Sequence, residues 1–311
     1  MLPTPLPLVS IVIPVWNGIN DTLECLDSLT TLTYPCFSII VVDNGSTDGT
    51  SEIVETWSKS HLEVCIIRHE QNLGFTKGCN AGIRKALTDN PQYLLLLNND
   101  TQVTPDFLTL LVEAAEADRK AGMVGPKVYK SEGKTIDSAG VHAISWLAQP
   151  FLIGHGEEDS GQYDMRKPVA YVTGCALLIK RAVIEHVGLL DEDYVNYFED
   201  FDWGYRATRY GYDLLYIPEA IIRHKGSLTS GLWSPFYYYH NTRSRILFAR
   251  KHTPLLVFLC AFLPYLLSYR YLLPALRLLK KHRWAHLRAL HRGLVDGFTT
   301  PLTHQKAVDR E

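Results

Sequence analysis

Short runs of apolar residues alternate along the first hundred positions with segments in which apolar residues recur at every third or fourth position. The runs are continuous and rich in Val, Ile and Leu, which is typical of strands buried on both faces of a sheet. The spaced segments have the period of an amphipathic helix. Strands that alternate with such helices predict βαβ units and an α/β fold with a mostly parallel central sheet. The expected strands are residues 8–14, 37–42, 64–68 and 93–97, and the expected helices are residues 20–32, 51–60 and 76–87.

The pattern is less regular beyond residue 104. A helix over residues 105–117 has Thr104 as its expected cap and Pro105 at its first helical position. Residues 133–167 are rich in Gly, Ser, Asp and His and show little periodicity, so we expect a long, partly ordered excursion there. Long loops in compact domains are usually functional. Apolar patterns also occur over residues 123–129, 169–181, 188–211 and 213–217.

The chain changes character near Ser234. Residues 255–267 form an apolar run of thirteen residues that includes Pro264, which is shorter than the roughly 20 residues needed to span a bilayer. Residues 241–295 contain eleven Lys or Arg and no Asp or Glu, whereas the preceding part has 18 basic and 30 acidic residues and therefore a net charge of -12. This split predicts an anionic partner for the C-terminal part, either a membrane surface or nucleic acid. A helical subdomain packed on the rest of the protein explains the apolar run equally well.

Composition and missing motifs narrow the class of protein. The 311 residues are 46% hydrophobic and 21% charged, as in globular proteins. Six scattered cysteines without a C-x-x-C pair argue against a zinc knuckle or a disulfide framework and fit a reducing compartment. Trp16-Asn17-Gly18 follows the first strand in place of G-x-G-x-x-G, and no G-x-x-x-x-G-K-[ST] occurs. The first absence disfavours a Rossmann dinucleotide site, and the second excludes a P-loop.

Small polar residues follow two of the expected strands. Asn98, Asn99 and Asp100 come directly after the leucine run, and Asp43 begins a loop of Asn, Gly, Ser and Thr over residues 43–50. Ligands of open α/β sheets bind beyond the carboxyl ends of the strands. A carboxylate there can hold a divalent cation and, through it, a diphosphate, or it can accept hydrogen bonds from a base or ribose. Asn and Asp also form ordinary turns, so each segment alone is equally consistent with a polar connection.

A second group of charged residues lies among aromatic side chains. Glu199, Asp200 and Asp202 are three carboxylates within four residues. Like charges and partial burial raise a carboxyl pKa and so produce a usable general base. The alternative is an acidic first turn that complements the dipole of a helix over residues 203–209. His224 follows another expected strand and can complete a metal site with carboxylates, although a lone His is more often a surface or core residue.

Seven motifs occur in one order: VSIVIPVWN, VVDNGSTDGT, NLGFTKGCNAGI, LLLLNND, TGCALLIKR, YFEDFDWGYRATRYGY and PEAIIRH. Together they closely resemble the family 2 inverting glycosyltransferases of GT-A fold, and more narrowly their bacterial rhamnosyltransferase-like members. The motifs cover about residues 8–230. The resemblance implies a GT-A-type nucleotide-binding sandwich with a C-terminal helical, basic and apolar extension. The expected domains are a catalytic domain over residues 1–233, with a nucleotide-sugar half to about 130 and an acceptor half from about 131, and an extension over residues 234–311.

The resemblance also implies roles for single residues. Asp43 is expected to contact the base and ribose of the donor. Asp100 matches the last residue of the family's D-x-D motif and is expected to hold Mg²⁺ or Mn²⁺ with His224, although Asn98 replaces the first carboxylate of that motif. Asp200 matches the catalytic base, with Glu199 beside it. Further nucleotide-binding residues are expected at Pro14, Asn17, Asn44, Gly74, Lys77, Asn80 and Asn99, and acceptor-binding residues at Gly174, Cys175 and Trp203.

The predicted protein is a metal-dependent enzyme that transfers a sugar, with rhamnose as a candidate, from a nucleoside diphosphate donor to a hydroxyl of a glycan or polyprenyl-linked acceptor in cell-surface polysaccharide synthesis. We expect it at the cytoplasmic face of the cell membrane, attached to an anionic surface but not spanning it. Two other classes stay open. A metal-dependent nucleotidyltransferase normally has a Gly-rich basic loop where this chain has WNGIN, and a nucleic-acid-binding protein with a basic tail is disfavoured by the acidic bulk, so no nucleic acid partner is expected.

Overall fold

The computed structural model describes residues 5–226 and 233–303. One sheet runs through residues 9–224 in the order β10-β12-β6-β11-β4-β1-β2-β3, with β5 beside β12 and β7 beside β6. The pairs β1–β2, β1–β4, β2–β3 and β6–β12 are parallel, and β11 is antiparallel to both of its neighbours. The sheet is therefore mainly parallel, as predicted. Its main strands are β1 (Val9–Val15), β2 (Phe37–Asp43), β3 (Val64–Arg68), β4 (Tyr93–Leu97), β6 (Ala121–Lys130), β11 (Ala176–Lys180) and β12 (Asp213–His224).

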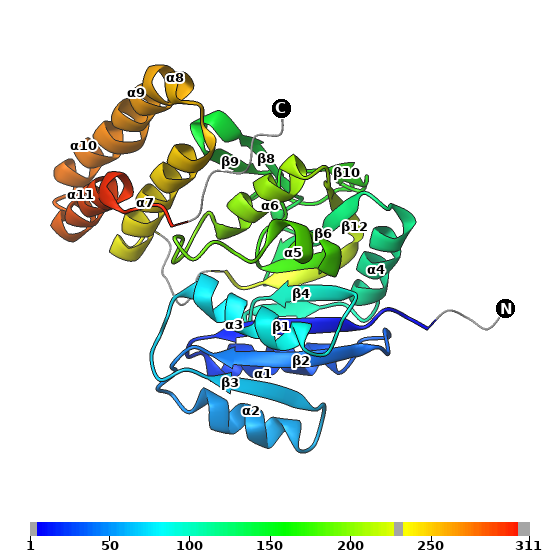
Figure 1. The fold of residues 1–311 in the computed structure, drawn as a ribbon. Helices are drawn as coiled ribbons and strands as arrows, with labels where there is room; N and C mark the ends of the chain where they lie inside the picture. The colour runs from blue at the N-terminus through cyan, green and yellow to red at the C-terminus, as the bar shows by residue number, and fades with distance from the viewer. Residues whose placement is uncertain (1–4, 227–232, 304–311) are drawn as a thin grey trace.

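Helices cover both faces of this sheet (Figure 1). Alternate residues of each strand face different cores: Leu95 packs in the core beneath α1, α2 and α4, and Leu94 packs in the core beneath α3, α5 and α6. This two-sided burial explains why the strands are continuous apolar runs. At Gly82 of α3 a Cβ atom would lie 2.3 Å from a methyl of Val12, so only glycine allows this close helix–sheet contact. The helices are α1 (Ile19–Leu29), α2 (Thr50–Ser58), α3 (Phe75–Leu87), α4 (Phe107–Ala117), α5 (Arg181–Val187) and α6 (Glu199–Arg209).

The structure differs from the sequence prediction beyond residue 104. Helix α4 begins at Phe107 after Asp106, and not at Pro105 after Thr104. The expected excursion over residues 133–167 is more ordered than predicted, because it contains short strands that pair with strands close by in sequence and, in one case, with β12. Strand β12 also continues to His224, well past residue 217, and pairs there with β5. The additional short elements are β5 (Thr101–Val103), β7 (Ile136–Ser138), β8 (Val141–Ile144), η1 (Ser145–Leu147), β9 (Gln149–Leu152) and β10 (Lys167–Pro168).

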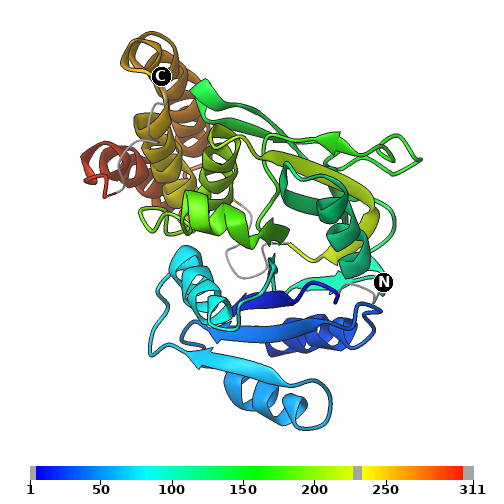
Figure 2. The ribbon, with the colours of Figure 1, turned by 45° about the vertical axis from the view of Figure 1, so that its right-hand side comes forward.

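The C-terminal part is a group of helices beside α6 and the β8–β9 hairpin, on the side of the molecule away from α2 (Figures 1 and 2). Its first helix, α7 (Pro235–His252), buries Ile246 and Phe248 completely in the core that also contains residues of α3, α5 and α6. A long helix follows over Leu255–Lys280, and α11 (Trp284–Thr299) packs on α7. The long helix consists of α8 (Leu255–Val257), η2 (Phe258–Phe262), α9 (Leu263–Tyr265), η3 (Leu266–Leu272) and α10 (Leu273–Lys280).

Helix Leu255–Lys280 has 26 residues and is long and apolar enough to cross a membrane by length and composition. The sequence prediction of a run too short to span is therefore wrong about its length, because the helix continues well past Leu267. Only 11% of its most apolar window is buried. Most of its apolar side chains consequently face away from the protein.

Candidate active site

The pairing of β5 with β12 brings together the two residues expected to bind metal. His224 lies opposite Thr101 in the antiparallel register, and the backbone N–H of Lys225 donates to the carbonyl of Asp100 at 3.0 Å. As a result, His224 Nε2 lies 3.3 Å from Asp100 Oδ1. Two strand ends that are more than a hundred residues apart in sequence thus meet at one edge of the sheet.

A third residue, Asp137 on β7, completes this polar cluster. Its Oδ2 lies 3.0 Å from Nδ1 of His224, on the opposite side of the imidazole from Asp100. Burial works against the charged form of His224, but the two carboxylates outweigh it and raise its pKa well above the ordinary value. Burial likewise acts to raise the pKa of Asp100, yet the hydrogen bond and charge of His224 dominate and lower it. The two carboxylates thus contact the imidazole through its two different ring nitrogens.

These residues fit a hard divalent cation. Metal–ligand bonds of about 2.1 Å place neighbouring ligand atoms about 3 Å apart, which matches the Asp100–His224 separation. Asn98 Oδ1 is a buried oxygen without a hydrogen-bond partner, two residues before Asp100. Within residues 5–226 and 233–303, no group of three or more His, Cys, Asp or Glu side chains is arranged around a metal position. The protein itself would therefore supply few ligands and leave coordination positions for a bound diphosphate.

The loops after β1 and β2 are bound to each other at the same edge of the sheet. Asp43 ends β2 with 6% of its surface exposed, and it accepts hydrogen bonds from the backbone N–H of Ser46, at 2.8 Å, and from the hydroxyl of Ser51. Asn17 Oδ1 accepts from the backbone N–H of Thr47 at 2.9 Å. A carboxylate offers about four lone-pair sites, so Asp43 keeps acceptor capacity for a ligand while it fixes its own loop.

Two more of the expected nucleotide-binding residues hold the turn before α3. The Nδ2 of Asn44 donates to the carbonyl of Gly74 at 3.0 Å, and Asn44 Oδ1 accepts from the backbone N–H of Leu73 at 3.1 Å. Gly74 has φ 88°, and a Cβ atom there would lie 2.6 Å from a methyl of Val195. Lys77 is exposed on the first turn of α3 and is free to point toward a ligand.

The remaining expected nucleotide-binding residues make contacts within the protein. Asn99 donates to the hydroxyl of Thr22 at 2.9 Å, and Pro14 is buried within β1. Asn80 is 1% exposed, donates to the carbonyl of Leu190 at 2.9 Å and accepts from its N–H at 3.1 Å. Because the Asn80 amide is saturated by these bonds and by Glu192, its contacts correct the expected nucleotide role: it fixes the segment after α5 onto α3.

The catalytic candidate Asp200 lies at the beginning of α6, after a strained turn. Tyr197 and Phe198 have φ 63° and 74°, and left-handed conformations of such bulky residues cost about 1–3 kcal/mol each. Asp200 Oδ2 accepts from the backbone N–H of Gly174 at 2.9 Å, and Oδ1 accepts from that of Phe201 at 2.8 Å. Burial raises the pKa of Asp200 despite these bonds. A buried carboxylate with a raised pKa is suited to act as a general base.

The carboxyl group of Glu199, the residue before Asp200, has a different environment. It is 6% exposed, and one of its carboxyl oxygens is buried without a hydrogen-bond partner. Burial, with the charge of Asp200 as a second cause, raises the pKa of Glu199 to about 8. Burial thus disfavours the charged form of Glu199, whereas Asp200 accepts two backbone N–H bonds that favour its carboxylate form.

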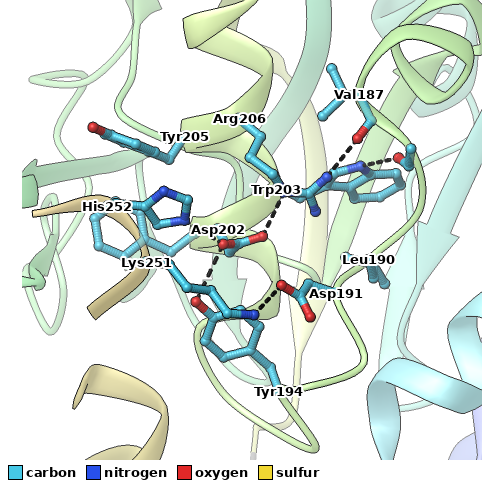
Figure 3. A network of polar contacts seen from close by, with 12 residues as sticks. Val187, Leu190, Asp191, Tyr194, Asp202, Trp203, Tyr205, Arg206, Lys251 and His252 are labelled. Atoms are coloured by element: carbon cyan, nitrogen blue, oxygen red, sulfur yellow. Dashed lines mark hydrogen bonds and ion pairs between the residues drawn. The ribbon is translucent and has the colours of Figure 1, made fainter. Parts of the chain in front are cut away.

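Asp202 and Trp203 face the interior (Figure 3). Asp202 is fully buried, and charged and polar partners, foremost Arg206 at 2.7 Å, outweigh desolvation and hold its pKa well below the ordinary value. Trp203 is also fully buried, and its Nε1 donates to the carbonyl of Gly188 at 2.9 Å. A side chain without exposed surface does not contact an acceptor, so the expected acceptor role of Trp203 is corrected to a core role.

One short segment connects the two chemical groups of the site. Gly174 holds Asp200 through its N–H, and the carbonyl of the next residue, Cys175, accepts from the backbone N–H of Asn98 at 2.9 Å. A Cβ atom at Gly174 would lie 3.8 Å from Asp200 and 3.7 Å from Phe75, so the segment is closely surrounded. This segment fixes Asp200 relative to the turn that carries Asp100.

Comparison with known sequences identifies relatives that act on sugars. The pattern of glycosyl transferase family 2 matches residues 10–188. N-acetylglucosaminyl-diphospho-decaprenol L-rhamnosyltransferase of Mycobacterium tuberculosis is 27% identical over 249 residues, which cover 73% of this chain and 80% of the relative. Poly-beta-1,6-N-acetyl-D-glucosamine synthase of Staphylococcus epidermidis is 24% identical over 215 residues, which cover 68% of this chain and 48% of the relative.

Solved structures share the fold. Mannosyltransferase PcManGT from Pyrobaculum calidifontis, in complex with GDP-Man and Mn²⁺, has a TM-score of 0.59 at 19% identity, covering 96% of this chain and 77% of the other. S. aureus TarS 1–349 with UDP-GlcNAc has a TM-score of 0.59 at 17% identity, covering 92% and 80%. These similarities confirm the predicted GT-A fold, and the sequence match over more than half of the residues shows that the chain belongs to glycosyl transferase family 2.

Proposed function

We propose that this glycosyltransferase is an inverting, metal-dependent enzyme that moves a sugar from a nucleoside diphosphate to a hydroxyl of a polyprenyl-linked glycan in cell-surface polysaccharide synthesis. The observation that carries the proposal is the state of Asp200. It is held by the N–H of Gly174 at 2.9 Å, its pKa is raised by burial, and its neighbours Glu199 and Asp202 are neutralised or paired. One carboxylate is thus left to accept a proton.

The reaction needs a single displacement. Asp200 accepts the proton of the acceptor hydroxyl while that oxygen attacks the anomeric carbon on the face opposite the diphosphate. The new C–O bond forms as the bond between the anomeric carbon and the phosphate oxygen breaks, and the diphosphate leaves with the electron pair. One displacement inverts the anomeric configuration and requires no covalent intermediate.

Asp100 and His224 are the proposed ligands of Mg²⁺ or Mn²⁺. A divalent cation there supplies positive charge that stabilises the departing diphosphate. The geometry that supports this is the 3.3 Å separation of the two ligand atoms and the buried, unpaired oxygen of Asn98. The archaeal mannosyltransferase of the same fold was solved with Mn²⁺.

The donor and acceptor are proposed from the relatives and the loops. We assign the nucleoside to the edge formed by Asn17, Asp43 and Asn44, with Lys77 near the diphosphate and Gly174 and Cys175 on the acceptor side. The mycobacterial relative is named for the transfer of L-rhamnose to a decaprenyl-linked N-acetylglucosamine, so rhamnose and a polyprenyl-linked acceptor are the first candidates. Membership of a glycosyltransferase family argues against a nucleotidyltransferase, and the absence of a nucleic acid partner stays a prediction.

The C-terminal part is proposed to attach the enzyme to the cytoplasmic face of the membrane. Helix Leu255–Lys280 exposes 71% of Leu255 and 73% of Leu256, and a basic cluster at Lys280, Lys281 and Arg283 follows it. Apolar residues and adjacent positive charges together favour an anionic leaflet. We place the domain boundary near residue 234, although residues 1–4, 227–232 and 304–311 lie outside the described residues.

The direct test is transfer from a panel of nucleoside diphosphate sugars to a synthetic polyprenyl-diphosphate N-acetylglucosamine, with NMR of the product's anomeric centre. We expect transfer from one donor, loss of activity with EDTA and an anomer opposite to that of the donor. Retention of configuration, or full activity in EDTA, would contradict the proposal. Calorimetry with Asp43→Ala tests the nucleoside site separately, because donor affinity should fall more than the rate of the bound complex.

A further inference from the structure

Asp137 contacts two imidazoles with its two carboxylate oxygens. Oδ2 lies 3.0 Å from Nδ1 of His224, and Oδ1 lies 3.3 Å from Nδ1 of His155. The side chains of His224 and Asp137 are 14% and 24% exposed, whereas that of His155 is 50% exposed. The contact with His224 is therefore the protected one, and His155 Nδ1 also lies 2.9 Å from the backbone carbonyl of Asp137.

The backbone that carries Asp137 is held firmly. Strand β7 pairs with β6, and both neighbours of Asp137, Ile136 and Ser138, are buried. The N–H of Ile136 donates to the carbonyl of Glu157 at 2.8 Å. Asp137 thus projects from a fixed strand toward His224, although 87 residues separate the two in sequence.

An imidazole that binds a cation through Nε2 must carry its proton on Nδ1. That N–H needs an acceptor, and the acceptor fixes both the tautomer and the orientation of the ring. Asp137 supplies such an acceptor on the side of the ring opposite Asp100. It also adds negative charge to a site in which Asn98 and Asn99 are neutral and Asp100 is the charged residue of its turn.

We infer that Asp137 is a positioning residue of the cation site: it accepts the Nδ1–H of His224 and so directs Nε2 toward the cation shared with Asp100. The inference rests on the proposed metal-dependent function. This role also connects the segment 133–167 with the site. The segment contains Asp137 and so supplies the hydrogen-bond acceptor for His224 Nδ1–H that the strand ends carrying Asp100 and His224 lack.

The test is direct binding of Mn²⁺ to the full-length enzyme, measured by the electron paramagnetic resonance signal of free Mn²⁺, in the presence of a nucleoside diphosphate. Loss of such an outer-sphere partner typically weakens metal binding 10–100-fold, and we expect this for Asp137→Ala. Asp137→Asn keeps an acceptor oxygen and should recover part of the affinity. His155→Ala, the matched control on the other oxygen, should remain within about twofold of the wild type, since it does not contact the ring of His224.

A second readout separates positioning from general stability. With Mg²⁺ bound, ¹⁵N NMR of the wild type should show His224 with its proton on Nδ1, and Asp137→Ala should lose this single tautomer. If Asp137→Ala does not fold, as judged by thermal unfolding, Asp137→Ser carries the same expectation, because its hydroxyl is too short to reach the ring. If a folded variant at Asp137 keeps the Mn²⁺ affinity and the His224 tautomer of the wild type, the positioning role of Asp137 is overturned. The proposed cation site would not be affected by that result. A wild type that binds Mn²⁺ no better than His224→Ala would overturn the proposed cation site and the inference together.

Discussion

His252 Nε2 lies 2.6 Å from Oδ1 of Asp202, and this contact joins the last residue of α7 to the helix that carries Asp200. Asp202 is fully buried and also binds Arg206 on its own helix (Figure 3). Next to His252, Lys251 contacts Asp191 and lies 2.7 Å from Asp193 in the segment before α6. The C-terminal part is therefore anchored to the catalytic helix through buried ion pairs.

Two interpretations of the C-terminal part were open from the sequence: a subdomain packed on the core, or a segment that contacts a membrane. The structure assigns packing to α7, whose Phe248 is fully buried against Phe201. It leaves the apolar face of helix Leu255–Lys280 exposed. The contact of His252 with Asp202 lies where these two parts meet.

Replacement of His252 by Ala should destabilise the protein and slow the enzyme. The change removes a partner from a buried carboxylate, which costs about 1–3 kcal/mol in the free energy of unfolding. Because Asp202 is two residues after Asp200, the beginning of α6 should also become less fixed. Urea unfolding and transfer rate measure the two effects, and His282→Ala, at an exposed position after α10, is the control. If His252→Ala and His282→Ala have the same free energy of unfolding, the contact between His252 and Asp202 does not stabilise the protein.

Asp200→Asn should reduce the transfer rate by about 10²–10⁴-fold, the usual effect of losing a positioned general base. Donor affinity should stay nearly constant, since the base contacts the acceptor. Burial raises the pKa of Asp200 above its ordinary 3.8, so the wild-type rate should begin to fall at a higher pH than for an exposed Asp, as the base becomes protonated. The test is to measure the transfer rate, and the donor affinity by calorimetry, for Asp200→Asn and for Glu199→Gln. Near-normal turnover of Asp200→Asn with an inactive Glu199→Gln would reverse the assignment.

Much of the fold was predictable because the local pattern agrees with the tertiary structure. The leucine run of β4 is apolar on both faces, and the sheet buries both of them, whereas the edge strand Val64–Arg68 has the same apolar pattern and is partly buried. The segment 133–167 was not predictable in this way. Its strands are only two to four residues long, and so short a strand leaves no periodic signal.

The candidate site was predictable where a residue ends a strand or begins a helix. Asp43 ends β2 and Asp200 lies in the first turn of α6, as expected, whereas Asp100 lies in the turn between β4 and β5. Asp137 was missed because its importance comes from a pairing across 87 residues, and no local signal marks it. The family resemblance assigned Trp203 to the acceptor, but its side chain is fully buried and its Nε1 donates to the carbonyl of Gly188 after α5.

Glu199→Gln should change how stability depends on pH. The pKa of Glu199 is raised from 4.5 to about 8 in the folded protein, so the folded state holds this proton more tightly than the unfolded state. The resulting stabilisation is fully present below pH 4.5 and is lost as pH rises toward 8. Gln is neutral throughout, so the variant should gain stability relative to the wild type by up to about 1.4 kcal/mol per pH unit in this range. Urea unfolding at pH 5, 6.5 and 8 tests this, and a pH-independent difference would contradict it.

Membrane attachment should depend on the exposed face of the long helix. Leu255 and Leu256 are 71% and 73% exposed, so their replacement by Glu alters no core contact but adds charge to the surface that is proposed to enter the leaflet. We expect the double variant to float with anionic vesicles far less than the wild type and to keep its melting temperature. Met165→Glu is the matched control, because Met165 is 80% exposed on the catalytic part.

The basic cluster that includes Lys280 and Lys281 allows a second, independent test of membrane attachment. Lys280→Gln with Lys281→Gln removes two charges, each contributing about 1 kcal/mol near an anionic surface, so binding to anionic vesicles should weaken roughly 30-fold. Binding to neutral vesicles should change little, because only the apolar face acts there. If the wild type binds neither kind of vesicle, the exposed leucines have another partner and the attachment proposal fails. If the lysine variant instead loses binding to both kinds equally, the cluster acts on the structure of the helix and not on the lipid charge.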